Sequence, residues 1–266
     1  MEVKQYNVKN RTVDVHELFT GKNLGNKRIG KILLAIHGYF FYQIFLATPL
    51  FNKLANKCIT PKDVVETSYN AFNNLPFKLF GWNLAVQQIQ EEFLNFLQII
   101  VKRQPSTILE IGTCGGGTLF ALTKIANPNA LIISLDLPKG SFGGGYYPYR
   151  IPYYKSFAKF NQKIKLVRAD SHSERSLNKI KKILSKRQVD ILFIDGDHSY
   201  KGVKRDFEMY SKLVKKGGLI AFHDILYDAL GCEVNEFWKE IKNSYPHTEI
   251  IKNLNQKWAG IGLIFV

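Results

Sequence analysis

Five short apolar runs alternate with helix-like stretches in the second part of the chain, and this alternation is the strongest constraint on its fold. The first run begins at Thr107 and the last ends at Asp224; in order they read TILEI, ALIISLDL, KIKLVRAD, VDILFID and GLIAFHD. Strands that alternate with helices form a parallel sheet, because each pair of parallel strands needs a crossover connection, which is right-handed. The sequence therefore predicts an α/β fold.

The segments before and after these runs complete the predicted domain. Residues 83–104 repeat apolar side chains at spacings of three and four, which predicts an amphipathic helix that ends before Pro105. At the other end, HTEIIKN and WAGIGLIFV are close enough in the sequence to pair as a terminal hairpin. We therefore expect a Rossmann-like domain over residues 85–266, with a mostly parallel seven-stranded sheet and a C-terminal antiparallel hairpin.

Residues 1–84 precede this domain and are predicted to form a helical extension. No residue between Lys31 and Lys53 carries a formal charge, so residues 32–51 are long enough to be considered as a membrane span. Several residues interrupt this apolar run, namely His37, Gly38, Gln43 and Pro49. Three interpretations remain open: core or lid helices, attachment to an anionic membrane surface with the help of nearby basic residues, and a true span.

The charge balance and the cysteines bear on partners and compartment. The chain has 37 Lys and Arg against 22 Asp and Glu, which gives a net charge of +15 and a pI near 9.6. This charge favours polyanionic neighbours such as nucleic acid, although a solvated Lys-rich surface explains it equally well. Cys58, Cys114 and Cys232 form no CxxC pair, so they predict neither a disulfide framework nor a zinc site. Without a secretory signal at the N-terminus, the expected compartment is a reducing cytoplasm.

The stretch ILEIGTCGGGTLFAL reads as a strand, a glycine-rich turn and the start of a helix, which brings backbone N–H groups close to a ligand. The dinucleotide fingerprint does not fit, because Cys114 stands where its second glycine belongs. The P-loop does not fit either, because the first lysine is Lys124. A purely structural turn remains the alternative to a binding loop.

An acidic residue two positions before the first glycine does fit a known pattern. Glu110 followed by the glycines of this turn resembles the first motif of class I S-adenosylmethionine-dependent methyltransferases. The resemblance implies that the cofactor is held by Glu110, Gly112, Thr113, Gly115 and Gly116. Asp136 ends the second run, where a carboxylate can accept hydrogen bonds from both ribose hydroxyls. Asp170 ends the third run and Ser171 follows it, at positions where family members typically contact adenine. Taken singly, a strand-end aspartate is also explained as a turn or helix-cap residue.

The stretch VDILFIDGDHSYKGVKRDFEMYSKLVKKGGLIAFHD is the most specific in the chain. It predicts a strand, a charged loop, a helix over 202–214, a Gly-Gly turn and a further strand. Asp195 and Asp224 then follow two neighbouring parallel strands, at the edge of the sheet where ligands bind.

With its DGDHSY and HD signatures, this stretch resembles the divalent-metal-dependent O-methyltransferases, and in particular the macrocin O-methyltransferase and cephalosporin-hydroxylase-like branch. The resemblance covers residues 85–266 and implies that Asp195 and Asp224 hold a metal ion. His223 departs from the pattern, because relatives often carry a carboxylate or pair the acid with Asn there. Oxygen ligands suit Mg²⁺, whereas an imidazole ligand would admit Mn²⁺ or a softer ion.

His198 stands three positions after Asp195, where the catechol-type enzymes of this group use a lysine as general base. An imidazole suits proton removal at neutral pH, so the predicted catalytic residues are His198 and Asp195. The alternatives are a loop histidine that bonds Asp197 or the backbone, and a purely structural pair of aspartates.

Residues 137–162 form a long connection that contains three consecutive glycines and five tyrosines. This composition predicts an aromatic loop that stacks on a sugar, an aryl ring or a base. A decorated surface loop is the alternative.

Together these features predict an S-adenosylmethionine-dependent, metal-assisted O-methyltransferase that acts on a hydroxylated small molecule, a glycan or a lipid-linked sugar. An RNA methyltransferase is the second hypothesis, although the chain lacks the Asn-Pro-Pro-Tyr or Asp-Pro-Pro-Tyr motif of enzymes that methylate amino groups of nucleic acids. A non-catalytic binding module with the same fold is the third. A second copy of the chain is a further candidate partner.

Overall fold

The computed structural model describes residues 48–70, 86–142, 145–226 and 231–266. Their centre is one seven-stranded sheet in the order β3-β2-β1-β4-β5-β7-β6. Neighbouring strands from β3 to β5 run parallel, whereas β7 is antiparallel to both β5 and β6. The strands are β1 Thr107–Ile111, β2 Leu131–Asp136, β3 Lys163–Arg168, β4 Val189–Ile194, β5 Val214–His223, β6 His247–Ile250 and β7 Ile261–Phe265. The predicted Rossmann-like fold with its C-terminal hairpin is confirmed.

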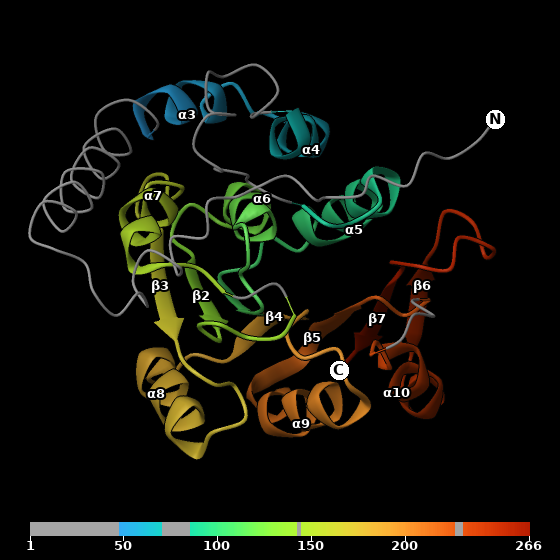
Figure 1. The fold of residues 1–266 in the computed structure, drawn as a ribbon. Coiled ribbons are helices and arrows are strands. Elements are labelled where there is room, and N and C mark those ends of the chain that lie inside the picture. The colour runs from blue at the N-terminus through green and yellow to red at the C-terminus, as the bar shows by residue number, and fades with distance from the viewer. Residues whose placement is uncertain (1–47, 71–85, 143–144, 227–230) are drawn as a thin grey trace, which may run out of the picture.

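Helices cover both faces of this sheet (Figure 1). One face carries α3 Thr48–Ala55, α4 Pro61–Asn70, α5 Gln90–Val101, α6 Gly117–Ile125 and α7 Ile151–Lys155, which follows the 3₁₀ turn η3 Pro148–Arg150. The other face carries α8 Glu174–Leu184, α9 Tyr200–Tyr210 and α10 Val234–Ile241, with the 3₁₀ turns η4 Ser211–Leu213 and η5 Lys242–Ser244. Two faces covered by helices explain why the strands read as continuous apolar runs.

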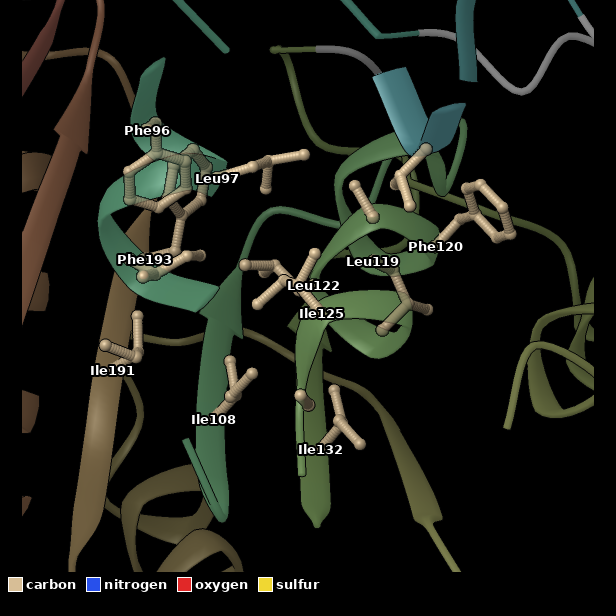
Figure 2. Packing of buried hydrophobic residues seen from close by; sticks show 14 of the residues in the cluster. Phe96, Leu97, Ile108, Leu119, Phe120, Leu122, Ile125, Ile132, Ile191 and Phe193 are labelled. Atoms are coloured by element: carbon tan, nitrogen blue, oxygen red, sulfur yellow. The ribbon is translucent and has the colours of Figure 1, made fainter. Parts of the chain in front are cut away.

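The hydrophobic core forms two layers, one on each face of the sheet. Alternate residues of a strand point to opposite faces, so Ile108 of β1 belongs to one layer and Leu109 to the other. Figure 2 shows the first layer, in which side chains of α5 and α6 pack against strand residues; the labelled ones are Phe96, Leu97, Ile108, Leu119, Phe120, Leu122, Ile125, Ile132, Ile191 and Phe193.

Three predicted boundaries differ from the structure. The helix predicted over 83–104 is α5, which begins at Gln90 and ends at Val101. The helix predicted over 202–214 is α9 with the turn η4, and it ends at Leu213. The predicted Gly-Gly turn is part of β5 instead. Gly217 donates its N–H to the carbonyl oxygen of Val266 at 2.6 Å, and Val266 donates its own to Gly218 at 3.0 Å. The last residue of the chain thus supplies hydrogen bonds that extend β5, which no local sequence signal revealed.

Helices α3 and α4 pack into the same core as the sheet. Phe51 and Ala55 of α3, and Val64 and Val65 of α4, are buried in the layer that also contains α5 and α6. Residues 32–47 of the uncharged run lie outside the described residues. Within the part of the chain that the structure describes, no helix combines the length and apolar character needed to cross a bilayer.

Replacing Phe51 with alanine is expected to lower the free energy of unfolding of the whole domain by about 3–5 kcal/mol, the usual cost of a buried Phe→Ala change. The Phe51 ring is 2% exposed and lies 5.0 Å from the ring centroid of Phe120 and 5.2 Å from that of Phe157. Chemical denaturation followed by fluorescence and by circular dichroism measures the change. Replacement of the exposed Ile59 is the control; a Phe51→Ala protein as stable as wild type would show that α3 is not part of the core.

Candidate active site

The glycine turn between β1 and α6 is built by backbone conformations that suit glycine. Gly112 and Gly116 have φ angles of +94° and +81°, and Gly116 is the N-cap of α6. A Cβ on Gly112 would lie 1.9 Å from the carbonyl oxygen of Asp195, and one on Gly116 would lie 2.6 Å from the Tyr154 ring. Gly115 is buried between them. The turn therefore brings β1 and the loop after β4 into direct backbone contact.

Glu110 lies at the base of this turn and is fully buried. Its carboxylate accepts a hydrogen bond of 2.5 Å from the Ser134 hydroxyl, which also contacts the hydroxyl of buried Thr113. Burial raises the pKa of Glu110 well above its usual range, and the charges of Asp136 and Asp195 act in the same direction while the Ser134 bond opposes them. Its Oε1 atom has no hydrogen-bond partner among the described residues. A buried acid with a free oxygen is suited to accept a hydrogen bond from a ligand.

Asp136 ends β2 and joins the glycine turn to the loop that follows it. Burial raises the pKa of Asp136 to about 6, although hydrogen bonds from backbone N–H groups at Cys114, Thr113, Leu137 and Tyr146 favour its charged form. Its Oδ2 atom is buried and unpaired within the described part of the chain. This carboxylate therefore contacts both the glycine turn and the loop after β2, and its Oδ2 atom is left for a ligand.

A cavity of about 120 Å³ opens at this edge of the sheet. Of the residues predicted to bind the cofactor, Gly112, Asp136, Asp170 and Ser171 line it. Thr113, Gly115 and Gly116 belong to the turn beside it, and Glu110 belongs to β1. Leu137 and Phe142 also line the cavity and are 46% and 39% exposed. Both belong to the loop of residues 137–162, but the sequence analysis predicted no binding role for either of them.

Asp195 lines the same cavity and also belongs to a cluster of acids and histidines. It follows β4 directly, while His223 is the last residue of β5 and Asp224 follows it, so adjacency of the two strands brings them together. His223 Nδ1 lies 3.3 Å from an oxygen of each aspartate. His198 also faces both, with Nε2 at 3.4 Å from Asp195 and Nδ1 at 3.5 Å from Asp224.

The second aspartate of the DGDH stretch has a different task. Asp197 accepts hydrogen bonds from the backbone N–H of Ser199 at 2.9 Å and from its hydroxyl at 2.7 Å. Ser199 is the N-cap of α9, and its hydroxyl accepts from the N–H of Gly202. Asp197 therefore holds in place the loop that contains His198. Among the described residues, the His198 ring makes no hydrogen bond to Asp197 or to a backbone group, and it faces Asp195 and Asp224 instead.

The electrostatics of the cluster follow from its two carboxylates. Burial disfavours the charged form of Asp195, but the charges and hydrogen bonds of His223 and His198 outweigh it and hold the pKa of Asp195 well below its usual range. Burial likewise opposes protonation of the histidines, yet the carboxylates raise the pKa of both His198 and His223 to about 10. In the absence of a metal ion the imidazoles thus carry the positive charge that the carboxylates attract.

The donor atoms of Asp195, His223 and Asp224 fit a divalent cation. They all lie within 4.8 Å of one another, and His223 Nδ1 lies 3.3 Å from an oxygen of each aspartate. Carboxylate oxygens and an imidazole nitrogen are common ligands of divalent cations. A divalent cation would take over the charge balance and leave the imidazoles neutral. Asp224 has a φ of +63°, a strained conformation for a residue with a side chain, and such strain gathers at functional sites.

Sequence reasoning missed one residue of this region. Cys232 lies between β5 and α10, is 8% exposed, and has its sulfur within 4.8 Å of donor atoms of His198 and Asp224. The only signal in the sequence was a lone cysteine eight positions after Asp224, with no partner at a metal-ligand spacing.

Residues 109–225, from β1 to the end of β5, match a family model described as a methyltransferase domain. The match contains the glycine turn, the strand-end aspartates and the acid cluster, and the sheet has the parallel strands and the C-terminal antiparallel pair that the sequence predicted. These residues form a methyltransferase domain, which confirms the predicted resemblance to class I S-adenosylmethionine-dependent methyltransferases.

Individual relatives add little about this methyltransferase domain's substrate. An uncharacterized protein of Acanthamoeba polyphaga mimivirus is 61% identical over 36 residues, which are 14% of this chain and 16% of that protein. An uncharacterized protein of Sinorhizobium fredii is 25% identical over 166 residues, 61% of this chain and 17% of that protein. The chain thus matches about a sixth of the length of either relative. A solved O-methyltransferase from Bacillus cereus in complex with S-adenosylhomocysteine (SAH) shares the fold, with a TM-score of 0.51, 20% identity, and coverage of 81% of this chain and 96% of that one.

Proposed function

We propose that this protein transfers the methyl group of S-adenosylmethionine to a hydroxyl oxygen of its acceptor, with a divalent cation held by Asp195, His223 and Asp224. The observation that carries the proposal is the place of Asp195. It lines the cavity formed by the loops that are predicted to bind the cofactor, and it is also part of the acid cluster. A methyl donor in that cavity and an acceptor at the cluster would therefore meet at this residue.

On the donor side, the groups of the cavity suit the parts of S-adenosylmethionine. The free carboxylate oxygen of Asp136 is suited to the ribose hydroxyls, and the free Oε1 atom of Glu110, beside the cavity, is suited to accept a hydrogen bond from an amino group. Asp170 and Ser171 would face the adenine. Gly112 lines the cavity, and the missing side chain lets the backbone of Asp195 lie against it.

On the acceptor side, the chain's own residues orient the hydroxyl and receive its proton. A divalent cation, when bound, lowers the pKa of a coordinated hydroxyl. Asp195 and Asp224 would hold that cation, and His198 would accept the proton as the oxygen attacks the methyl group. His198 suits this role better than His223, because its side chain is 23% exposed and that of His223 only 3%. Methyl transfer then leaves SAH, the methyl ether and a protonated imidazole.

The rim of the cavity favours an acceptor with a flat or apolar face. The Phe142 ring stacks on His198 with centroids 4.9 Å apart, and it lines the cavity together with Leu137. Tyr147 and Tyr149 of the same loop stack on each other at 5.4 Å. Aromatic planes beside the predicted base suit an aryl ring or the apolar face of a sugar. We therefore propose a hydroxylated small molecule or a glycan as the acceptor class.

SAH is expected to raise the melting temperature of the wild-type protein, and Asp136→Ala is expected to abolish that rise. A ligand at 100 times its dissociation constant stabilises a protein by about 2.7 kcal/mol. Asp136 is tied to the glycine turn and keeps one oxygen free, so its loss removes a contact to the ligand. Thermal shift measurements with SAH and with NAD give the answer.

The conservative variant Asp136→Asn controls for lost loop contacts, because an amide oxygen still accepts the backbone hydrogen bonds. We expect it to melt close to the wild type without ligand and to respond weakly to SAH. A response to NAD equal to that for SAH would contradict the assignment of the cavity.

A further inference from the structure

His198, Asp224 and Cys232 form a second group of donor atoms next to the one proposed for the catalytic cation. One nitrogen, one carboxylate oxygen and one sulfur lie within 4.8 Å of one another, and they share only Asp224 with the first group. The His198 Nδ1 atom lies 3.5 Å from Asp224 Oδ2, and the Cys232 sulfur lies within 4.8 Å of donor atoms of both residues. Asp224 and Cys232 are both buried.

Backbone contacts fix the cysteine in this place. The N–H of Glu233, the next residue, donates to the carbonyl oxygen of His198 at 2.7 Å. The Glu233 carboxylate in turn accepts from the N–H of Tyr200 at 2.8 Å. Helix α10 begins at Val234 and is anchored by buried Phe237 and Trp238. The segment with Cys232 is therefore tied to the loop with His198 on one side and to the core on the other.

The chemistry of this group differs from that of its neighbour. A thiolate and an imidazole with a single carboxylate select borderline or soft cations, whereas Mg²⁺ prefers oxygen ligands and keeps its waters. Three protein ligands with an open fourth position are the arrangement of many non-structural Zn²⁺ sites. Such a cation would occupy a ring nitrogen of His198, the residue proposed to accept the proton.

We propose that His198, Asp224 and Cys232 form a site for a thiophilic divalent cation such as Zn²⁺, distinct from the Asp195–His223–Asp224 site, and that its occupation inhibits methyl transfer by blocking His198. The inhibitory part rests on the proposed function; the site itself does not. A cell could thus regulate the enzyme through free Zn²⁺ without any change in the cofactor cavity.

Co²⁺ reports directly on the thiolate. Added to the full-length, chelator-treated protein, Co²⁺ is expected to produce a near-ultraviolet thiolate-to-metal charge-transfer band, which Cys232→Ser abolishes and the control Cys58→Ser retains. His223→Ala should keep the band while weakening Mn²⁺ binding, measured by electron paramagnetic resonance. Cys232→Ser should lose the band while keeping the Mn²⁺ affinity of the wild type. Absence of the band in the wild type, or its survival in Cys232→Ser, would overturn the site.

Zn²⁺ tests the regulatory part. The affinity of the protein for Zn²⁺ should fall more than about a hundredfold in Cys232→Ser. Even the loss of a residue outside the ligand shell typically lowers metal affinity about 10–100-fold. Zn²⁺ should inhibit methyl transfer by the Mn²⁺-loaded wild type but not by Cys232→Ser, whose activity without Zn²⁺ should match the wild type. Equal inhibition of both proteins would refute the block of His198. If no methyl transfer is found at all, the proposed function fails while the cobalt spectrum still decides the site.

Discussion

Asp195→Ala and Asp224→Ala are each expected to lower kcat/KM by at least about a hundredfold, since partners outside a metal's ligand shell alone are typically worth about 10–100-fold. The two carboxylates lie on adjacent strand ends and each approaches His223 Nδ1 to 3.3 Å. Residues that hold one ion act as a unit, so the double variant should be little worse than either single one. Steady-state transfer of a labelled methyl group to an identified acceptor measures the effect.

The matched control is Asp190→Asn at the opposite end of β4. Asp190 accepts hydrogen bonds from the N–H groups of Ser106 and Thr107 and pairs with Lys215, so it is an acid of the same strand with a structural role. Its replacement should leave kcat/KM near the wild-type value. Full activity of the chelator-treated enzyme, together with normal turnover by Asp224→Ala, would show that the acid cluster is structural.

Gly112→Ala is expected to destabilise the protein by about 2–6 kcal/mol, from about 1–3 kcal/mol of backbone strain and about 1–3 kcal/mol of overpacking. The φ of Gly112 is +94°, and the added Cβ would lie 1.9 Å from the carbonyl oxygen of Asp195. Because both atoms are held by the backbone, relief of this contact must move β1 away from the loop after β4. The change should therefore also abolish SAH binding. Urea unfolding and thermal shift with SAH measure the two effects.

Gly217→Ala is the control that separates backbone strain from the steric clash of an added Cβ. Gly217 has a φ of +77°, but a Cβ there would meet no atom within 4 Å. Its replacement should cost about 1–3 kcal/mol of backbone strain and no more, and SAH binding should persist. If Gly112→Ala is no more damaging than Gly217→Ala, the close approach of the two loops is not required for folding.

Part of the acid cluster could be predicted from local sequence, and part could not. Asp195 and Asp224 could be predicted as neighbours because each follows an apolar strand, and adjacent parallel strands end at the same edge of a sheet. The orientation of His198 could not, because it depends on how Asp197 and Ser199 shape the loop and on contact with Phe142. Both ring nitrogens face carboxylates, which proximity in sequence to Asp195 alone does not imply.

The sequence by itself determined the order of strands and helices, the glycine turn and the strand-end acids, because apolar periodicity and the conformational range of glycine act over a few residues. Only the tertiary structure decided what depends on distant segments. Val266 extends β5 past the predicted turn, Phe51 joins the core of the sheet, and Cys232 reaches His198. Each of these contacts joins residues more than thirty positions apart in the sequence. The free energy that selects them comes from packing and hydrogen bonds between distant segments, which no local pattern encodes.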